Sequence, residues 1–227
     1  MRVASLVLGA GRGERLGYAL PKAFVPLAGK PLLAWALSRL ACVSELDLLL
    51  PVIPPGEAAR YAELCEGLDC RDKLAPAIEG GAERQDSVYA GLQALPDDVG
   101  WVAVHDAARA LIRPESVRRV LEVARREGAA ILALPVSDTI KRVQGGRIVS
   151  TPPRAECYAA QTPQVFRVEL LREALEKARA EGRRGTDCAE LVEALGAEVH
   201  VVLADADNLK ITWPADLLLA GRILEDG

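Results

Sequence analysis

The 227-residue sequence is poor in aromatic residues, which make up 4% of it, although half of the residues are hydrophobic. A core must therefore consist mainly of Leu, Val, Ala and Ile. No apolar run approaches the roughly 18 residues that a membrane-spanning helix needs, and the chain starts with a strand-like segment rather than a signal peptide. We expect a cytoplasmic protein with a single α/β domain over residues 1–227, a length that suffices for a full core.

An excess of positive charge is also missing. The formal net charge is −4 and the pI is near 5.4, which argues against nonspecific binding to nucleic acid or to a membrane surface. The cysteines are odd in number and show no zinc-binding spacing, so we expect reduced, buried thiols. They are Cys42, Cys65, Cys70, Cys157 and Cys188. A site for an anionic ligand must then be a local cluster of basic groups.

A glycine-rich segment follows the first apolar run, Val3–Leu8. Its sequence at positions 9–17 is Gly-Ala-Gly-Arg-Gly-Glu-Arg-Leu-Gly, with the arginines at 12 and 15, and Lys22 follows shortly after. Main-chain N–H groups of such a turn bind phosphate oxygens, and neighbouring cations strengthen the binding. The segment predicts a nucleotide phosphate site that uses Arg12, Arg15 and Lys22.

Two common nucleotide motifs do not fit this loop. The third glycine of a dinucleotide fingerprint is replaced by Glu14 or, in the other register, by Leu16. A Walker A loop needs Gly-Lys-Ser/Thr, but the first lysine, Lys22, is followed by Ala23. The remaining pattern is typical of nucleotidyltransferases that join a nucleoside triphosphate to a phosphorylated small molecule. An ordinary glycine-rich turn is the alternative.

Strand-like and helix-like segments alternate along the chain. Apolar runs predict further strands at residues 45–53, 73–78, 101–104, 129–134 and 198–203. Helical spacing predicts helices at 32–40, 57–66, 84–95, 167–181 and 187–195, and from residues 114 and 214 onward. This alternation indicates a Rossmann-like, mainly parallel sheet with helices on both faces. Ligands of such sheets bind beyond the carboxyl ends of the strands, where the predicted loops at Gly9, Gly80 and Asp106 meet.

Residues 136–154 depart from this alternation. Thr139–Val143 and Arg147–Val149 flank a Gln-Gly-Gly turn and predict a β-hairpin. A hairpin this short has no core of its own and must pack on another surface. Since a second copy of the chain is the economical partner, we expect a protruding β-arm in a homodimer.

Eight short motifs follow one another along nearly the whole chain. They are Gly9-Ala10-Gly11-Arg12-Gly13-x-Arg15-Leu16, Pro21-Lys22, Gly80-Gly81-x-x-Arg84-x-x-Ser87-Val88, His105-Asp106-Ala107-Ala108-Arg109, Asp138-Thr139-x-Lys141, Gln161-Thr162-Pro163-Gln164, Thr186-Asp187 and Ala206-Asp207-Asn208-x-Lys210. Together they closely resemble the 2-C-methyl-D-erythritol 4-phosphate cytidylyltransferase family. Two positions depart from the family pattern, Ala110 in place of Pro and Tyr158 in place of a frequent Trp.

The resemblance implies a fold of the nucleotide-diphospho-sugar transferase type and a reaction of the non-mevalonate isoprenoid pathway. CTP and 2-C-methyl-D-erythritol 4-phosphate would give 4-diphosphocytidyl-2-C-methyl-D-erythritol and pyrophosphate, with Mg²⁺ and in a homodimer. A phosphomonoester has its second pKa near 6, so the attacking phosphate needs no general base at pH 7. Cations must instead offset the repulsion between the two anions. Arg15, Lys22 and Lys210 are the expected catalytic cations.

Further roles follow from the same resemblance. The triphosphate would bind at Gly9, Ala10, Gly11 and Gly13, and the base at Gly80, Gly81 and Ser87, where glycines let the backbone approach a ring. Asp106 is the expected carboxylate for Mg²⁺, a hard ion that prefers oxygen, with Asp207 as a second possibility. Capping of a turn is the alternative for Asp106, and starting a helix is the alternative for Ser87. We expect His105 and His200 to be structural.

The acceptor site is expected to combine two subunits. The resemblance implies Asp106, Arg109, Thr162 and Lys210 from one subunit, with Thr139 and Arg154 from its neighbour. Arginine is suited to this role because its guanidinium binds phosphate in a bidentate manner. A surface arginine is the alternative for Arg154.

Two rival functions stay open. A nucleotidyltransferase of the same fold would act on another polyol phosphate, such as ribitol 5-phosphate, or on a sugar 1-phosphate. A regulatory nucleotide-binding protein would be expected to lack Lys22, Asp106 or Lys210, and all three are present. We expect neither nucleic acid nor a membrane as a partner.

Overall fold

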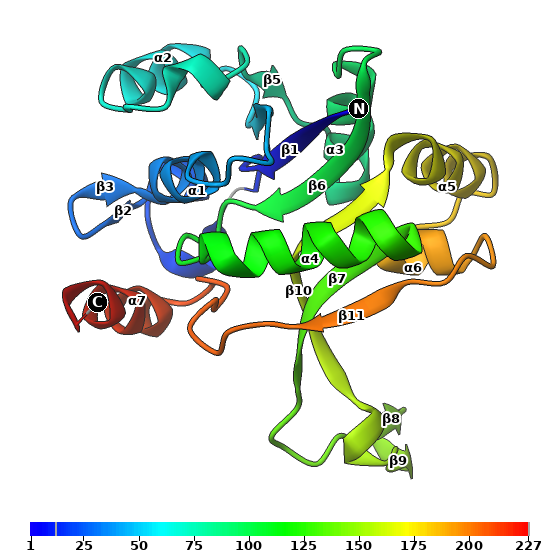
Figure 1. The fold of residues 1–227 in the computed structure, drawn as a ribbon. Helices are drawn as coiled ribbons and strands as arrows, with labels where there is room; N and C mark the ends of the chain where they lie inside the picture. The colour runs from blue at the N-terminus through cyan, green and yellow to red at the C-terminus, as the bar shows by residue number, and fades with distance from the viewer. Residues whose placement is uncertain (12, 227) are drawn as a thin grey trace.

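The computed structural model describes residues 1–11 and 13–226 (Figure 1). Seven strands form one sheet in the order β11-β7-β10-β6-β1-β4-β5. Their bounds are β1 Arg2–Leu8, β4 Leu48–Ile53, β5 Ile78–Glu79, β6 Val99–Asp106, β7 Ala129–Pro135, β10 Tyr158–Arg167 and β11 His200–Leu203. Strand β10 runs antiparallel to both of its neighbours, and the other neighbouring pairs are parallel. The predicted mainly parallel sheet is confirmed.

Helices cover both faces of this sheet (Figure 1). One face packs against α1 (Leu32–Ala41), α2 (Ala58–Glu66) and α4 (Pro114–Glu127), and the other against α3 (Arg84–Gln93), α5 (Val168–Ala180) and α6 (Cys188–Glu193). Side chains of β1 alternate between the two clusters, with Val3 and Val7 in one and Ala4 and Leu6 in the other. The period of two in a strand therefore builds two apolar layers from one continuous apolar run.

The last helix, α7 (Pro214–Asp226), packs beside the glycine-rich segment. Its Ala220 belongs to a small buried cluster with Leu16 and with Leu27 of the short hairpin β2 (Pro26–Leu27) and β3 (Lys30–Pro31). Short 3-10 helices η1 (Glu14–Leu16) and η2 (Lys22–Phe24) shape the same segment. The end of the chain thus supports the loop at its beginning.

Two strands differ from the sequence-based expectation. Strand β10 was not predicted, because Gln161, Thr162 and Gln164 are buried in its centre and hide any apolar alternation. The strand predicted at 73–78 was wrong in extent, because only Ile78–Glu79 pairs as a strand and a 3-10 helix, η3, occupies Arg71–Lys73.

The predicted hairpin is present as β8 (Arg142–Gln144) and β9 (Arg147–Ser150), an antiparallel pair that projects away from the large sheet (Figure 1). All residues from 137 to 151 are exposed in the single chain. Val143, Ile148 and Val149 are among them, with 54%, 63% and 49% of their surface accessible. The arm has no core of its own, as its length requires.

Two further expectations concern membranes and thiols. None of the helices formed by residues 1–11 and 13–226 has the length and apolarity to cross a membrane. The five cysteines carry free thiols as predicted, but only Cys188 is buried, so the expectation of burial was wrong for the other four.

Candidate active site

The glycine-rich segment forms one wall of a cleft of about 520 Å³, which we call the loop cleft. Most of the residues predicted to bind the nucleotide line it, namely Gly9, Ala10, Gly11, Gly13, Arg15, Lys22, Gly81, Ser87 and Asp106, and so does the predicted catalytic cation Lys210. Arg84 and Thr212, for which no role was predicted, also line it. Arg12 lies outside the described residues. Segments from both ends of the chain therefore meet at the carboxyl ends of β1 and β6.

Close packing explains two glycines of this region. Gly13 has a positive φ of 71°, and a Cβ atom there would lie 2.6 Å from Cβ of Lys22. A Cβ atom on Gly80 would lie 2.4 Å from Cβ of Ala10 and 2.8 Å from Oγ of Ser87. A side chain at Gly13 would displace the Lys22 segment, and one at Gly80 would displace the glycine-rich segment or the Ser87 segment. Gly80 does not line the cleft itself, but its lack of a side chain lets these segments meet.

Ser87 shapes the turn that carries Gly81. The main-chain N–H of Gly81 donates a hydrogen bond to Oγ of Ser87 at 3.2 Å, and that hydroxyl donates to the carbonyl oxygen of Glu83 at 3.1 Å. Ser87 is 3% exposed. It therefore holds the turn next to the cleft. The alternative that Ser87 starts the helix is wrong, because α3 begins at Arg84 with Glu83 as its N-cap.

Asp106 ends β6 between two cations. Its Oδ1 atom lies 3.2 Å from Nε of Arg84, and its Oδ2 atom lies 2.7 Å from Nζ of Lys210. Burial alone would raise the pKa of the Asp106 carboxyl, but Arg84 and Lys210 together hold it well below its usual value. Asp106 is therefore ionised at neutral pH.

Lys22 lies in a strongly positive environment. Burial, the positive charge of Lys210 and that of Arg15 lower the pKa of Lys22 to about 8, against the opposing effect of Asp106. The guanidinium of Arg15 lies over the ring of Trp213, 5.5 Å from its centroid. Among the described residues, four basic side chains line the loop cleft against three carboxylates. Its lining is therefore positive on balance in a protein of negative net charge, which suits a polyanion such as a triphosphate.

A second, smaller hollow of about 230 Å³ adjoins the loop cleft, and we call it the polar hollow. Arg109, Thr162 and Gln164 line it, and Arg84, Asp106 and Lys210 line both cavities. The four residues predicted for the acceptor from one subunit therefore come together here. The three shared charged residues lie where the contents of the two cavities would meet.

His105 precedes Asp106 in β6 and contacts two residues that line the polar hollow, Thr162 and Arg109. Its ring is fully buried, with Nδ1 3.2 Å from Oγ1 of Thr162 and Nε2 3.2 Å from the carbonyl oxygen of Arg109. Burial lowers its pKa to about 4, so the imidazole is neutral at pH 7 and donates through Nε2, because a carbonyl only accepts. His105 has a structural position, and His200 lies elsewhere, 3.7 Å from Glu127.

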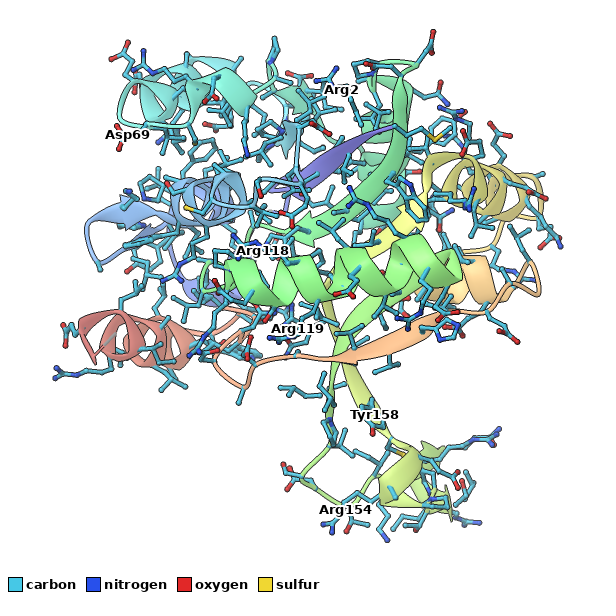
Figure 2. The ribbon with its side chains drawn as sticks, viewed as in Figure 1. Arg2, Asp69, Arg118, Arg119, Arg154 and Tyr158 are labelled. Carbon is cyan, nitrogen blue, oxygen red and sulfur yellow. The ribbon has the colours of Figure 1, made fainter. Side chains whose placement is uncertain are left out.

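The structure of the single chain does not bring Thr139 or Arg154 to either cavity. Arg154 lies in η4 (Arg154–Glu156) beside the arm, well away from the sheet, as Figure 2 shows. Its Nη1 atom donates to the carbonyl oxygen of Ser137 at 3.1 Å. Neither residue lines either cavity of its own chain.

Asp207 is not brought to Asp106 as a second metal ligand. Its carboxylate accepts hydrogen bonds from Arg113, and it lines neither cavity. Within the part of the chain that the structure describes, no cluster of three or more His, Cys, Asp or Glu side chains has the geometry to hold a metal ion. The carboxylates that line the loop cleft are Glu14, Glu83 and Asp106, and of these Asp106 alone also lines the polar hollow. Within residues 1–11 and 13–226, Asp106 is therefore the one carboxylate shared by the two cavities.

Two adjoining cavities that share Arg84 and Lys210 suit a nucleotide and a second anionic substrate, as the reaction of a nucleotidyltransferase requires. The family model of 2-C-methyl-D-erythritol 4-phosphate cytidylyltransferase matches residues 3–226. The chain belongs to this family.

Relatives and solved structures agree with this assignment. The chain is 42% identical over 227 residues to the 2-C-methyl-D-erythritol 4-phosphate cytidylyltransferase of Geotalea uraniireducens, covering 99% of this chain and 97% of the relative. The enzyme of that name from Thermosynechococcus vestitus is 44% identical over 221 residues, covering 97% and 94%. The crystal structure of the Thermus thermophilus enzyme is 39% identical, with a TM-score of 0.81 and coverage of 99% and 100%. The 4-diphosphocytidyl-2C-methyl-D-erythritol synthase of Anaerococcus prevotii is 27% identical, with a TM-score of 0.88 and coverage of 99% and 96%.

Proposed function

We propose that this chain transfers CMP from CTP to 2-C-methyl-D-erythritol 4-phosphate in the non-mevalonate isoprenoid pathway. The products are 4-diphosphocytidyl-2-C-methyl-D-erythritol and pyrophosphate. The observation that carries the proposal is the position of Asp106, Arg84 and Lys210 on the boundary between the loop cleft and the polar hollow. One cavity suits a nucleoside triphosphate, the other a smaller polar acceptor, and the shared cations suit the two phosphates that react.

The reaction is an in-line attack by an oxygen of the acceptor phosphate on the α-phosphorus of CTP. A new P–O bond forms to the acceptor, the bond between the α-phosphorus and the bridging oxygen breaks, and pyrophosphate leaves with its electron pair. The attacking phosphate is already largely ionised at pH 7, so no side chain has to remove a proton. Arg15, Lys22 and Lys210 offset the repulsion between the anions and stabilise the charge that develops on the phosphoryl oxygens.

The glycine-rich segment binds the triphosphate of the nucleotide, and a second turn recognises its base. Main-chain N–H groups of Ala10, Gly11 and Gly13 bind the triphosphate. The N–H of Gly9 donates to the carbonyl oxygen of Val52 at 2.7 Å, so Gly9 only lines the site. The turn at Gly81, held by Ser87, faces the base, and Gly80 contributes by leaving room for the turn beside Ala10.

Mg²⁺ is the proposed metal. Mg²⁺ binds through one or two carboxylates together with substrate phosphates, and Asp106 lines the loop cleft beside its basic residues. This donor set fits an ion held mainly by the nucleotide. When bound, the ion supplies charge neutralisation and fixes the triphosphate, and Asp106 orients Lys210 and Arg84 toward the same region.

We further propose a cytoplasmic homodimer in which the arm of each subunit completes the acceptor site of the other. Support comes from the exposed apolar residues of the arm and from five free thiols, which are typical of a reducing compartment. The arm also projects away from the large sheet in Figure 1. Thr139 and Arg154 of the neighbouring subunit then bind the acceptor with Asp106, Arg109 and Thr162.

The test is pyrophosphate release by the purified protein with Mg²⁺, each nucleoside triphosphate in turn and a panel of polyol phosphates. We expect release with CTP and 2-C-methyl-D-erythritol 4-phosphate, and at least about tenfold less with UTP or with ribitol 5-phosphate, which corresponds to about 1.4 kcal/mol in the barrier. Preference for ribitol 5-phosphate, or no release with the expected pair, would reject the proposal.

A further inference from the structure

The only asparagine of the chain, Asn208, is buried behind residues that line the polar hollow. It lies in the segment between β11 and α7, two residues before Lys210, and 1% of its surface is accessible. It lines neither the loop cleft nor the polar hollow. Its effect on either ligand must therefore pass through its neighbours.

The side chain of Asn208 connects this segment to the centre of β10. Its Nδ2 atom donates to Oε1 of Gln161 at 2.7 Å and to the carbonyl oxygen of Thr162 at 3.1 Å. A main-chain carbonyl only accepts hydrogen bonds, so the amide must turn its NH₂ group toward Thr162. The geometry thus requires an amide donor at this position.

These bonds close a ring of contacts around the reacting region. The main-chain N–H of Asp106 donates to Oγ1 of Thr162 at 3.0 Å, and Nζ of Lys210 donates to Oδ2 of Asp106 at 2.7 Å. Asn208 joins Thr162 to the segment that carries Lys210. The ring therefore fixes Lys210, which lines both cavities, relative to Thr162, which lines only the polar hollow.

Arg109 braces the same two segments through their backbones. Its Nη1 atom donates to the carbonyl oxygen of Asn208 at 2.7 Å, and its Nη2 atom donates to that of Ala160 at 3.3 Å. This brace persists when the side chain of Asn208 is removed. A substitution at Asn208 therefore loosens the ring without releasing the segment.

We propose that Asn208 is a positioning residue for the transfer reaction, holding Lys210 at a fixed place relative to Thr162 so that the α-phosphate of CTP meets the acceptor phosphate. This role rests on the proposed function. Because the loop of Gly9–Gly13 and Lys22 bind the triphosphate independently of the ring, loss of Asn208 affects the chemical step more than CTP binding. A misplacement of about 1 Å costs on the order of 100-fold in rate.

The first test is steady-state kinetics of Asn208→Ala and Asn208→Asp. We expect kcat to fall about 10- to 100-fold in both, with KM for CTP within about threefold of wild type. The aspartate keeps the shape of the side chain but places an oxygen against the carbonyl of Thr162, so it should not restore the rate. Tyr61→Phe is the matched control, because it removes a hydrogen bond to the carbonyl of Ala75 at 3.2 Å, far from the ring.

The second test is a double-mutant cycle with Lys210→Ala. If Asn208 acts through Lys210, adding Asn208→Ala to Lys210→Ala changes the residual kcat by less than about twofold. A general weakening of the fold would instead multiply the two losses. Thermal melting of each variant shows that it is folded at the assay temperature, and Asn208→Ser replaces Asn208→Ala if the alanine variant is not.

The outcomes separate the two proposals. A wild-type protein that releases no pyrophosphate overturns the proposed function, and the positioning role with it. An active wild type whose kcat is unchanged by folded Asn208 variants overturns the positioning role alone. Multiplicative losses in the double-mutant cycle, or a rise in KM for CTP that matches the fall in kcat/KM, also overturn it.

Discussion

Nζ of Lys210 lies 2.7 Å from Oδ2 of Asp106, although 104 residues separate the two along the chain. The other carboxylate oxygen faces Arg84. The single negative charge of Asp106 thus holds two cations from distant parts of the chain at one boundary. It also opposes the lowering of the pKa of Lys22, so this carboxylate influences three cations of the site.

Removal of the Asp106 charge should cost stability in a pH-dependent way. Asp106→Asn leaves Arg84 partly buried without its carboxylate, and we expect a loss of about 3 kcal/mol in the free energy of unfolding at pH 7. Since folding lowers the pKa of Asp106 from 3.8, the stabilisation is present above pH 3.8 and declines as the pH falls below it. Urea unfolding of both proteins from pH 7 to pH 2 measures the difference. Asp98→Asn, which breaks the exposed pair with Arg2, should cost less than about 1 kcal/mol; an equal loss in both variants would contradict the expected effect of burial.

Lys22 should make activity depend on pH in the mildly alkaline range. Its ammonium group has a pKa of about 8 and must be charged to bind phosphate. We expect kcat/KM for CTP to decline above pH 8, approaching roughly tenfold for each further pH unit. Because bound triphosphate favours the charged form, kcat should decline only at higher pH.

Substitutions distinguish this titration from general effects of alkali. Lys22→Arg carries a group that does not lose its proton in this range, so whatever activity it retains should stay level across pH 8. Lys177→Arg, on the exposed side of α5, should keep the wild-type profile. Lys22→Ala should lower kcat by two or more orders of magnitude while folding persists, and near-normal activity would remove Lys22 from the catalytic cations.

The absence of a side chain at Gly80 should be essential for CTP use. An alanine Cβ there would lie 2.4 Å from Cβ of Ala10, so the glycine-rich segment or the Ser87 segment must move. We expect Gly80→Ala to reduce kcat/KM for CTP on the order of 100-fold. Adding Ala10→Gly removes the closest contact and should restore part of this loss. Gly221→Ala has open space around its Cβ on α7 and should leave the kinetics unchanged; similar kinetics for Gly80→Ala would show that the turn can yield.

The sequence predicts the central strands β1, β4, β6 and β7 well because they are buried on both faces and read as continuous apolar runs. Strand β10 escapes the same analysis because three of its buried residues are polar. Thr162 and Gln164 are tolerated there through partners far away in the chain, the main chain of Asp106 and the side chain of Asp187. Such partners exist only in the folded protein, so no local pattern reveals them.

The candidate site divides in the same way. The glycine-rich loop, Lys22 and Asp106 are predictable because each follows a strand or a recognisable motif. Arg84 lies within the motif that starts at Gly80, but its pairing with Asp106 depends on how α3 packs beside β6. Asp207 shows the converse, because its motif suggests a metal ligand while the fold turns its carboxylate toward Arg113. Motifs predict which residues are near the site, and tertiary packing decides which of them face it.

The arm should make each acceptor site dependent on two subunits. We expect Arg154→Ala and Lys22→Ala homodimers to be nearly inactive, each for a different reason. In a mixed dimer, the site that takes Lys22 from the Arg154→Ala chain takes Arg154 from the Lys22→Ala chain, and is intact. Random equimolar mixing makes half of the dimers mixed, with one intact site each, so activity should recover to about a quarter of wild type.

A second mixture provides the control for this complementation. Lys22→Ala and Lys210→Ala affect residues that line one cleft of the same chain, so every site of their mixed dimer lacks one of the two lysines. That mixture should stay inactive. Differently tagged chains allow the mixed dimers to be isolated before the assay. If isolated dimers of the Arg154 and Lys22 variants release no pyrophosphate, the acceptor site is not shared between subunits, and Arg154 must act, if at all, within its own chain. Equal activity in both mixtures would indicate contamination by wild-type protein. Only a site shared between subunits makes the recovery of activity depend on which two residues are changed.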